Sequence, residues 1–292
     1  MHRTLISTDA LAAHLDGSWA IVDCRYDLHT EAWGREQYLA AHIPGAVYAS
    51  LSRDLSGPRT GANGRHPLPC VEDLETTLGR FGIASNTQVV MYDQDAGMYA
   101  SRMWWMLRYM GHDAAAVLDG GWARWLREQR PTRSGEESRT AEVFTAHRRK
   151  ELRVLLDRVQ AAADDASLQL VDARAPERFE GTNEPLDRAA GHIPGAVNHF
   201  FRRNVSADGM MLPPDRLRDQ FQEVMGDRSP EQVVMYCGSG VTACQNLLAM
   251  EHAGLPGAKL YVGSWSEWSA DPTRPVETGP GASAKFKLQS EK

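Results

Sequence analysis

A cysteine in the second half of the chain has neighbours that could make it a nucleophile. Cys237 follows the apolar run VVMY, and the segment GSGVTA that comes after it leads into a helical pattern. Two glycines let this loop curl so that successive N–H groups point inward, and a helix N-terminus adds partial positive charge. Both features favour the thiolate, which is the reactive form of cysteine. The alternative is a buried structural cysteine at a strand end, and the local sequence does not separate the two.

An internal duplication favours the chemical interpretation. In the first copy Asp93 stands at the position of Cys237, so the fold does not require a cysteine there. The shift of about 150 residues is too long for a solenoid and indicates one domain duplicated. Four segments recur in the same order: VDCR at 22–25 and VDAR at 171–174, AHIPGAV at 41–47 and GHIPGAV at 191–197, VVMYD at 89–93 and VVMYC at 233–237, and LDGGWARW at 118–125 and YVGSWSEW at 261–268.

Each copy predicts strands that alternate with helices. Alternation of this kind predicts an α/β fold with two tandem domains, each a mostly parallel sheet flanked by helices, and ligands that bind at the carboxyl ends of the strands. We expect strands at 20–23, 89–92, 117–118, 168–172, 233–236 and 259–262, and helices at 99–109 and 241–252.

The domain boundaries follow from composition. The segment EQRPTRSGEESR at 128–139 is rich in Pro, Ser, Gly and charge, which is typical of a linker. We therefore expect a first domain over 1–130, a linker over 131–150, a second domain over 151–275 and a C-terminal tail over 276–292.

Composition narrows the class of protein. The chain has 292 residues and a formal charge of -6, which suggests about two domains and argues against nucleic acid or an anionic membrane surface as a partner. No apolar stretch approaches the 18 or so residues of a membrane span, and the N-terminus has no apolar core of a secretion signal. The four cysteines, Cys24, Cys70, Cys237 and Cys244, show no zinc spacing. We expect a cytoplasmic protein without a metal.

The motifs resemble the rhodanese/3-mercaptopyruvate sulfurtransferase family over residues 1–275. The resemblance lies in CGSGVTAC at 237–244, the paired HIPGAV motifs and GSWSEW at 263–268. It implies an inactive first rhodanese domain, with which Asp93 agrees, and a catalytic second one. It further implies that Cys237 takes a sulfane sulfur from 3-mercaptopyruvate or thiosulfate as a persulfide, without a cofactor. The sulfur then passes to cyanide or to a thiol acceptor, for which a thioredoxin-like reductant is a candidate.

The resemblance also assigns the other residues of the site. Arg178, in ERFEGTNEP, matches an arginine that binds the anionic donor, and Arg188 is a weaker candidate; a solvated surface arginine is the alternative for Arg178. The amides that stabilise the persulfide would be those of Gly238, Ser239, Gly240, Val241 and Thr242.

His66, in GRHPLP, matches a histidine that relatives place near Ser239 in an Asp–His–Ser relay. The usual position of the aspartate holds Ser52 here, and Asp54 lies two residues on. A structural role for His66 is therefore the alternative.

Three other functions compete with a 3-mercaptopyruvate sulfurtransferase. A cysteine phosphatase needs Cys-x5-Arg, but Ala243 stands at the sixth position after Cys237. A non-catalytic rhodanese-type binding or regulatory module would not need the cysteine. A thiosulfate-preferring rhodanese would carry basic side chains in the loop, where Gly238 and Ser239 are neutral. We therefore expect a preference for 3-mercaptopyruvate, which brings one negative charge rather than two.

Overall fold

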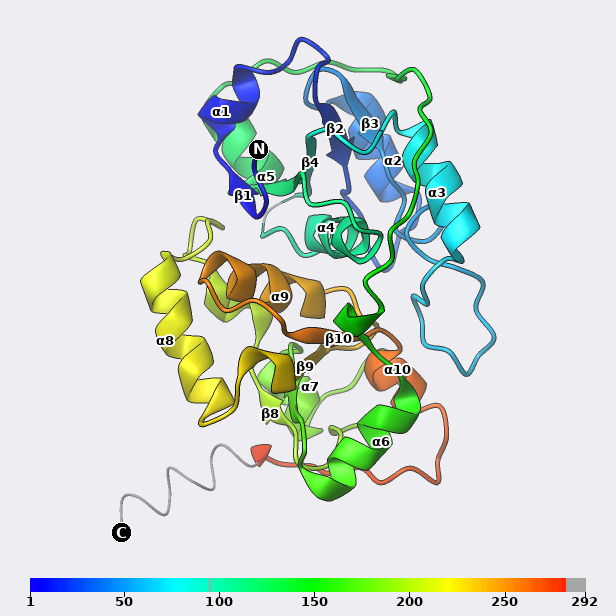
Figure 1. Cartoon of the computed structure of the whole chain (residues 1–292), viewed down its shortest axis with the longest axis vertical. Coiled ribbons are helices and arrows are strands. Elements are labelled where there is room, and N and C mark those ends of the chain that lie inside the picture. Colours follow the sequence, from blue (N-terminus) through cyan, green and yellow to red (C-terminus); the bar gives the residue numbers. More distant parts are fainter. Residues whose placement is uncertain (95, 282–292) are drawn as a thin grey trace. The chain divides into compact units, whose positions relative to one another are not determined.

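A computed structural model describes residues 1–94 and 96–281, which form two compact units (Figure 1). Unit 1 comprises residues 1–58, 68–149 and 205–211, and unit 2 comprises residues 59–67, 150–204 and the described residues from 212 onward. Residues 131–149 of the segment expected to be a linker thus belong to unit 1, and residues 59–67 of the first half belong to unit 2. Of the expected tail at 276–292, residues 282–292 lie outside the described residues.

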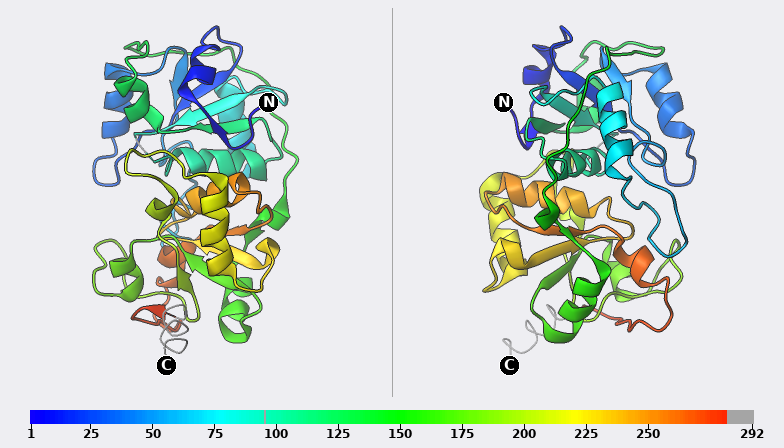
Figure 2. Two further views of the ribbon diagram at one scale, coloured as in Figure 1. Left: turned by 90° about the vertical axis from the view of Figure 1, so that its left-hand side faces the viewer. Right: turned by 45° about the vertical axis from the view of Figure 1, so that its right-hand side comes forward.

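Unit 1 contains a five-stranded parallel sheet with strand order β1-β5-β4-β2-β3. Helix α4 packs on β4 and β5 (Figure 2). The elements are β1 (Leu5–Ile6), α1 (Thr8–Ala12), β2 (Ala20–Asp23), α2 (Trp33–Ala40), β3 (Ala46–Tyr48), α3 (Val71–Arg80), β4 (Val89–Tyr92), α4 (Ala100–Tyr109), β5 (Ala115–Leu118) and α5 (Gly121–Arg127).

Unit 2 repeats this topology with strand order β6-β10-β9-β7-β8, again all parallel. The predicted α/β class with two parallel sheets is confirmed. The elements are the 3-10 turn η1 (Lys150–Leu152), β6 (Arg153–Val154), α6 (Leu156–Asp165), β7 (Gln169–Asp172), α7 (Pro176–Glu180), β8 (Val197–Asn198), η2 (Phe201–Asn204), α8 (Pro214–Met225), η3 (Pro230–Gln232), β9 (Val233–Tyr236), α9 (Ala243–His252), β10 (Lys259–Tyr261) and α10 (Ser264–Trp268).

The central strand of unit 2 is buried on both faces, because helices cover each side of the sheet. All four residues of β9 are buried, and alternate side chains point to opposite faces. Val234 and Tyr236 join a cluster with residues of α6, α7 and α10. On the other face α8 and α9 lie side by side (Figure 1), and Asn246 of α9 contacts the Met235 sulfur. This explains why a β-branched run without polar alternation forms the strand that precedes Cys237.

The duplication continues into the segment that follows the last helix of each unit. In unit 1 the Trp125 indole donates to Pro131 O at 2.9 Å, and Glu137 accepts from Gly45 N. Unit 2 repeats both contacts, from Trp268 to Pro275 O at 2.9 Å and from Gly195 N to Glu277. Residues 131–137 therefore wrap back onto unit 1 as an integral part of its fold, despite their linker-like composition.

No helix within residues 1–94 and 96–281 is both long enough and apolar enough to cross a membrane.

Candidate active site

Cys237 lies at the carboxyl end of the central strand of unit 2. It directly follows β9, which pairs with β10 and β7 on either side, and its side chain is 2% exposed. Its backbone is held on both sides, because Cys237 N donates to Ser264 Oγ at 3.2 Å and Cys237 O accepts from Trp265 N at 2.9 Å. The first residues of α10 therefore hold the backbone of Cys237 in place at the start of the loop.

The loop after Cys237 turns at Gly240, where only glycine fits. Gly240 has φ +73°, and a Cβ there would lie 2.4 Å from Val262 O. Beyond this turn α9 begins at Ala243. Within the described residues, the backbone N–H groups of five loop positions have no hydrogen-bond acceptor: Gly238, Ser239, Val241, Thr242 and Ala243.

Unit 1 shows what such a loop does with an anion. The Asp93 carboxylate replaces the thiol and accepts from three backbone amides, those of Gly97 at 3.0 Å, Tyr99 at 2.8 Å and Ala100 at 3.0 Å. The corresponding positions in unit 2 are Val241, Ala243 and Cys244; the Cys244 amide is already donated to Val241 O at 3.0 Å. The loop of unit 2 turns one residue earlier than that of unit 1, at Gly240 rather than at the position of Gly97. It still leaves the amides at 241 and 243 without an acceptor among the described residues, so that they can serve a sulfur anion on Cys237. Comparison of the two copies in sequence had indicated only that unit 1 has no thiol at this position, and not that Asp93 binds the loop amides.

His66 and Ser239 form a buried hydrogen-bonded pair within unit 2. His66 Nδ1 lies 2.8 Å from Ser239 Oγ, and both side chains are buried. The two residues considered for the third member of a relay have partners in unit 1. Ser52 donates to Glu31 at 2.5 Å, while Asp54 accepts from Ser50 N at 2.8 Å and forms an ion pair with Arg80. The geometry therefore supports a His66–Ser239 pair, while Asp54 binds Ser50 and Arg80 in unit 1.

Arg178 enters the site from α7 as part of an ion-pair cluster. Its Nε and Nη2 donate to Glu184, at 3.0 and 2.8 Å, and its Nη2 also donates to Asp187 at 3.0 Å. Asp187 in turn pairs with Arg65, which comes from the segment before His66. The Asp187 side chain is 4% exposed, and this burial raises the pKa of its carboxyl group.

Arg188 lies outside this cluster. It is exposed and makes no hydrogen bond or ion pair with any of the residues that the structure describes. The reason is local: Glu184 Oε1 accepts from Leu186 N at 3.0 Å and Asp187 N at 3.1 Å, which closes a turn. That turn points Asp187 toward the two arginines, and the next residue faces solvent. The sequence NEPLDR showed the charges of this segment but not which one faces inward.

The other three cysteines have structural surroundings. Cys24 is buried against the Met103 sulfur, and Cys244 is buried and donates to Gly240 O at 3.3 Å. Cys70 is exposed at the N-terminus of α3, where its sulfur accepts from Asp73 N at 3.3 Å.

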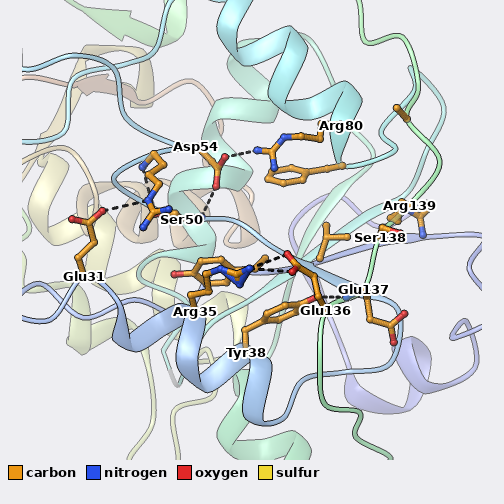
Figure 3. A pocket seen from close by; sticks show the side chains of 15 residues that line it. Glu31, Arg35, Tyr38, Ser50, Asp54, Arg80, Glu136, Glu137, Ser138 and Arg139 are labelled. Carbon is orange, nitrogen blue, oxygen red and sulfur yellow. Dashed lines mark hydrogen bonds and ion pairs between the residues drawn. The ribbon is translucent and has the colours of Figure 1, made fainter.

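A pocket of about 510 Å³ in unit 1 contains Asp54, considered for the relay, and none of the other predicted site residues (Figure 3). Several of its charged side chains pair with one another: Arg35 faces Glu136 at 3.1 Å across the pocket, and Asp54 lies beside Arg80. We therefore place the candidate site in unit 2.

Known proteins share both the sequence and the fold. The rhodanese-like domain family matches residues 7–128 and 155–271. A probable 3-mercaptopyruvate sulfurtransferase of Pseudomonas aeruginosa is 43% identical over 278 residues, covering 94% of this chain and 98% of the relative. The thiosulfate sulfurtransferase of Rattus norvegicus is 33% identical over 298 residues, covering 97% and 98%. The solved structure of the Leishmania major 3-mercaptopyruvate sulfurtransferase gives a TM-score of 0.81 at 30% identity, covering 91% of this chain and 74% of that one.

Proposed function

The chain belongs to the rhodanese-like family as a sulfurtransferase of the 3-mercaptopyruvate/thiosulfate type, and from this premise we propose that Cys237 carries the sulfur as a persulfide. The activity requires a small-molecule sulfur donor and an acceptor. One observation carries the assignment of the residue. Cys237 stands where Asp93 of unit 1 receives three backbone amides, so its loop is built to hold an anion at the side-chain terminus.

The transfer proceeds in two displacements. The Cys237 thiolate attacks the sulfur of 3-mercaptopyruvate, an S–S bond forms, and the donor's carbon–sulfur bond breaks. The thiol proton of the donor moves to the carbon that loses the sulfur, so that pyruvate leaves. With thiosulfate the sulfur–sulfur bond breaks instead, and sulfite leaves. An acceptor thiol then takes the outer sulfur and releases the Cys237 thiolate.

Each group near Cys237 has a separate task in this scheme. The amides of Val241 and Ala243 stabilise negative charge on the persulfide, as their counterparts do for Asp93. The His66–Ser239 pair moves the thiol proton of 3-mercaptopyruvate, because Ser239 comes two residues after Cys237 and its Oγ lies 2.8 Å from His66 Nδ1. Arg178 binds the carboxylate of the donor.

We propose 3-mercaptopyruvate as the preferred donor, but on a different basis from the neutral loop. The sequence showed only that the loop residues Gly238 and Ser239 are themselves neutral. A Cβ on Gly238 would lie 2.7 Å from Arg65 Nη2 and 3.4 Å from Arg178 Nη1, so two cations flank it from outside the loop. Both are partly neutralised by Glu184 and Asp187. A monoanionic carboxylate suits this balance better than a dianion.

The acceptor that we propose is a dithiol reductant of the thioredoxin type. Its first thiol would take the sulfur, and its second would expel sulfide and leave a disulfide. Cys24, Cys70, Cys237 and Cys244 are all free, which suits the reducing cytoplasm as the compartment. Loss of the persulfide on mixing with a reduced thioredoxin tests the acceptor.

The proposal is tested with two cysteine variants. We expect Cys237→Ser to abolish thiocyanate formation from either donor and cyanide, since the hydroxyl of serine is a far weaker nucleophile than a thiolate. Cys70→Ser is the matched control, because Cys70 is exposed and lies outside unit 2, and it should keep wild-type turnover. Substantial turnover by Cys237→Ser contradicts the proposal.

A further inference from the structure

We propose that Asp187 positions Arg65 and Arg178 as a two-arginine anion site beside Gly238 and, by its own charge, sets the preference for a monoanionic sulfur donor. This inference rests on the proposed role of Cys237 as the nucleophile. Asp187 acts through the two arginines and is a positioning residue, whereas Arg65 contacts the donor.

The first observation is that one buried carboxylate holds both arginines. Asp187 Oδ1 pairs with Arg65 Nη1, and Asp187 Oδ2 accepts from Arg178 Nη2 at 3.0 Å. The Asp187 side chain is 4% exposed, whereas those of Arg65 and Arg178 are 24% and 18% exposed. The carboxylate therefore lies beneath two guanidinium groups that remain open to a ligand.

The second observation is the direction of the nitrogens that Asp187 does not use. Within the described part of the chain, Arg65 Nη2 and Arg178 Nη1 have no hydrogen-bond acceptor. Both lie close to the point where a Gly238 Cβ would be, at 2.7 and 3.4 Å. Two donors thus converge beside the residue that follows Cys237, which is the arrangement that a carboxylate or thiosulfonate needs.

The third observation is the charge balance of the cluster. Arg174 shares Glu184 with Arg178: it pairs with Glu184 at 3.0 Å and with Asp172 at 2.7 Å, so that the cluster holds three arginines and three carboxylates. With all of them ionised its net charge is zero. Directed hydrogen bonds therefore hold the donor more than net electrostatic attraction does. A second negative charge on the donor adds little to its binding free energy. Removal of the Asp187 charge would leave one net positive charge within a few ångströms of the donor.

Two substitutions should shift the donor preference in opposite directions. Asp187→Asn keeps the size of the side chain and an oxygen acceptor but removes the charge. We expect the ratio of kcat/KM for thiosulfate to that for 3-mercaptopyruvate to rise roughly tenfold, because one unit charge at ~6 Å favours the dianion even after solvent screening. Arg65→Gln removes a cation and the free Nη2. It should raise KM for both donors, more for thiosulfate, and lower the same ratio by roughly tenfold.

A second carboxylate, on the helix that carries Arg178, provides the control. Glu177 precedes Arg178 on α7, is exposed and has no side-chain partner in the part of the chain that is described. Glu177→Gln makes the same change in net charge as Asp187→Asn, and it should leave the donor ratio within twofold of wild type. A shift equal to that of Asp187→Asn would mean that overall charge sets the preference, which overturns the inference.

The outcome can be separated from that of the proposed function. If Asp187→Asn and Arg65→Gln both fold by thermal melting but leave the donor ratio within twofold of wild type, Asp187 does not set the preference, although Cys237 keeps its role. If Asp187→Asn does not fold, the Arg65→Gln ratio alone decides in the same way. If Cys237→Ser retains sulfur transfer, the proposed function itself fails.

Discussion

Two glycines in the active-site loop should respond differently to the same substitution. Gly238 does not have a positive φ, and a Cβ there meets the ends of flexible arginine side chains, 2.7 Å from Arg65 Nη2. Gly240 has φ +73°, and a Cβ there meets the backbone oxygen of Val262 at 2.4 Å, which cannot move aside. Gly238→Ala should therefore disturb donor binding, and Gly240→Ala should disturb the fold.

The magnitudes follow from these contacts. Displacing a guanidinium from a charged hydrogen bond costs about 1.5–3 kcal/mol, so Gly238→Ala should raise donor KM roughly ten- to a hundredfold and leave the melting temperature and kcat nearly unchanged. A strained backbone costs about 1–3 kcal/mol before the clash is counted. Gly240→Ala should therefore lower the melting temperature by at least about 4 °C for a domain of this size, with a loss of kcat.

Thermal melts and donor titrations on the two variants test this reasoning. Cyanide-linked assays give kcat and KM for 3-mercaptopyruvate and for thiosulfate. If the melting temperature of Gly238→Ala is as low as that of Gly240→Ala, the new methyl group is not accommodated by movement of the arginine side chains. If Gly238→Ala leaves KM unchanged for both donors, they do not bind the donor.

Three further predictions concern single side chains. Arg178→Ala should raise donor KM roughly ten- to a hundredfold and also lower the melting temperature, since the buried Glu184 carboxylate loses one of its two arginine partners and keeps only Arg174; unchanged KM for both donors removes Arg178 from the site. His66→Ala should slow turnover of 3-mercaptopyruvate more than that of thiosulfate, because only the former has a thiol proton to move; equal slowing would indicate structural damage. Burial lowers the pKa of His199 to about 4. Between about pH 6.5 and 4 the unfolded chain therefore binds a proton that the folded chain does not. The free energy of unfolding should decrease by about 3 kcal/mol as the pH falls through that window. Urea unfolding of wild type and His199→Gln at pH 7, 5.5 and 4.5 checks this, and equal losses in both proteins would contradict it.

The strands could be predicted because their signals are local, and Cys237 could be singled out as a candidate because the chain is duplicated. The four-residue runs at 89–92 and 233–236 are apolar throughout and are bounded by loop residues, and both are strands in the structure. Comparison of the two copies identified Cys237 as different from its counterpart without any knowledge of the fold.

The contacts around the donor could not be predicted in the same way. Arg65 and Asp187 are 122 residues apart, and an ion pair between distant loops leaves no periodic pattern in the sequence. The inward direction of Asp187 depends on a turn that the Glu184 side chain closes. Likewise, the linker-like composition of residues 131–137 did not reveal that Pro131 and Glu137 bind the body of unit 1, because polar surface segments have the same composition whether or not they are docked.

The central claim is that Cys237 carries the sulfur, and intact-protein mass spectrometry tests it most directly. After incubation with 3-mercaptopyruvate and removal of the donor, wild type should gain the mass of one sulfur atom, peptide mapping should place it on Cys237, and cyanide should remove it. Cys70→Ser should behave in the same way, and Cys237→Ser should gain nothing. A cyanide-labile sulfur on Cys24, Cys70 or Cys244 in place of Cys237, or none on a protein that turns over, would contradict the account.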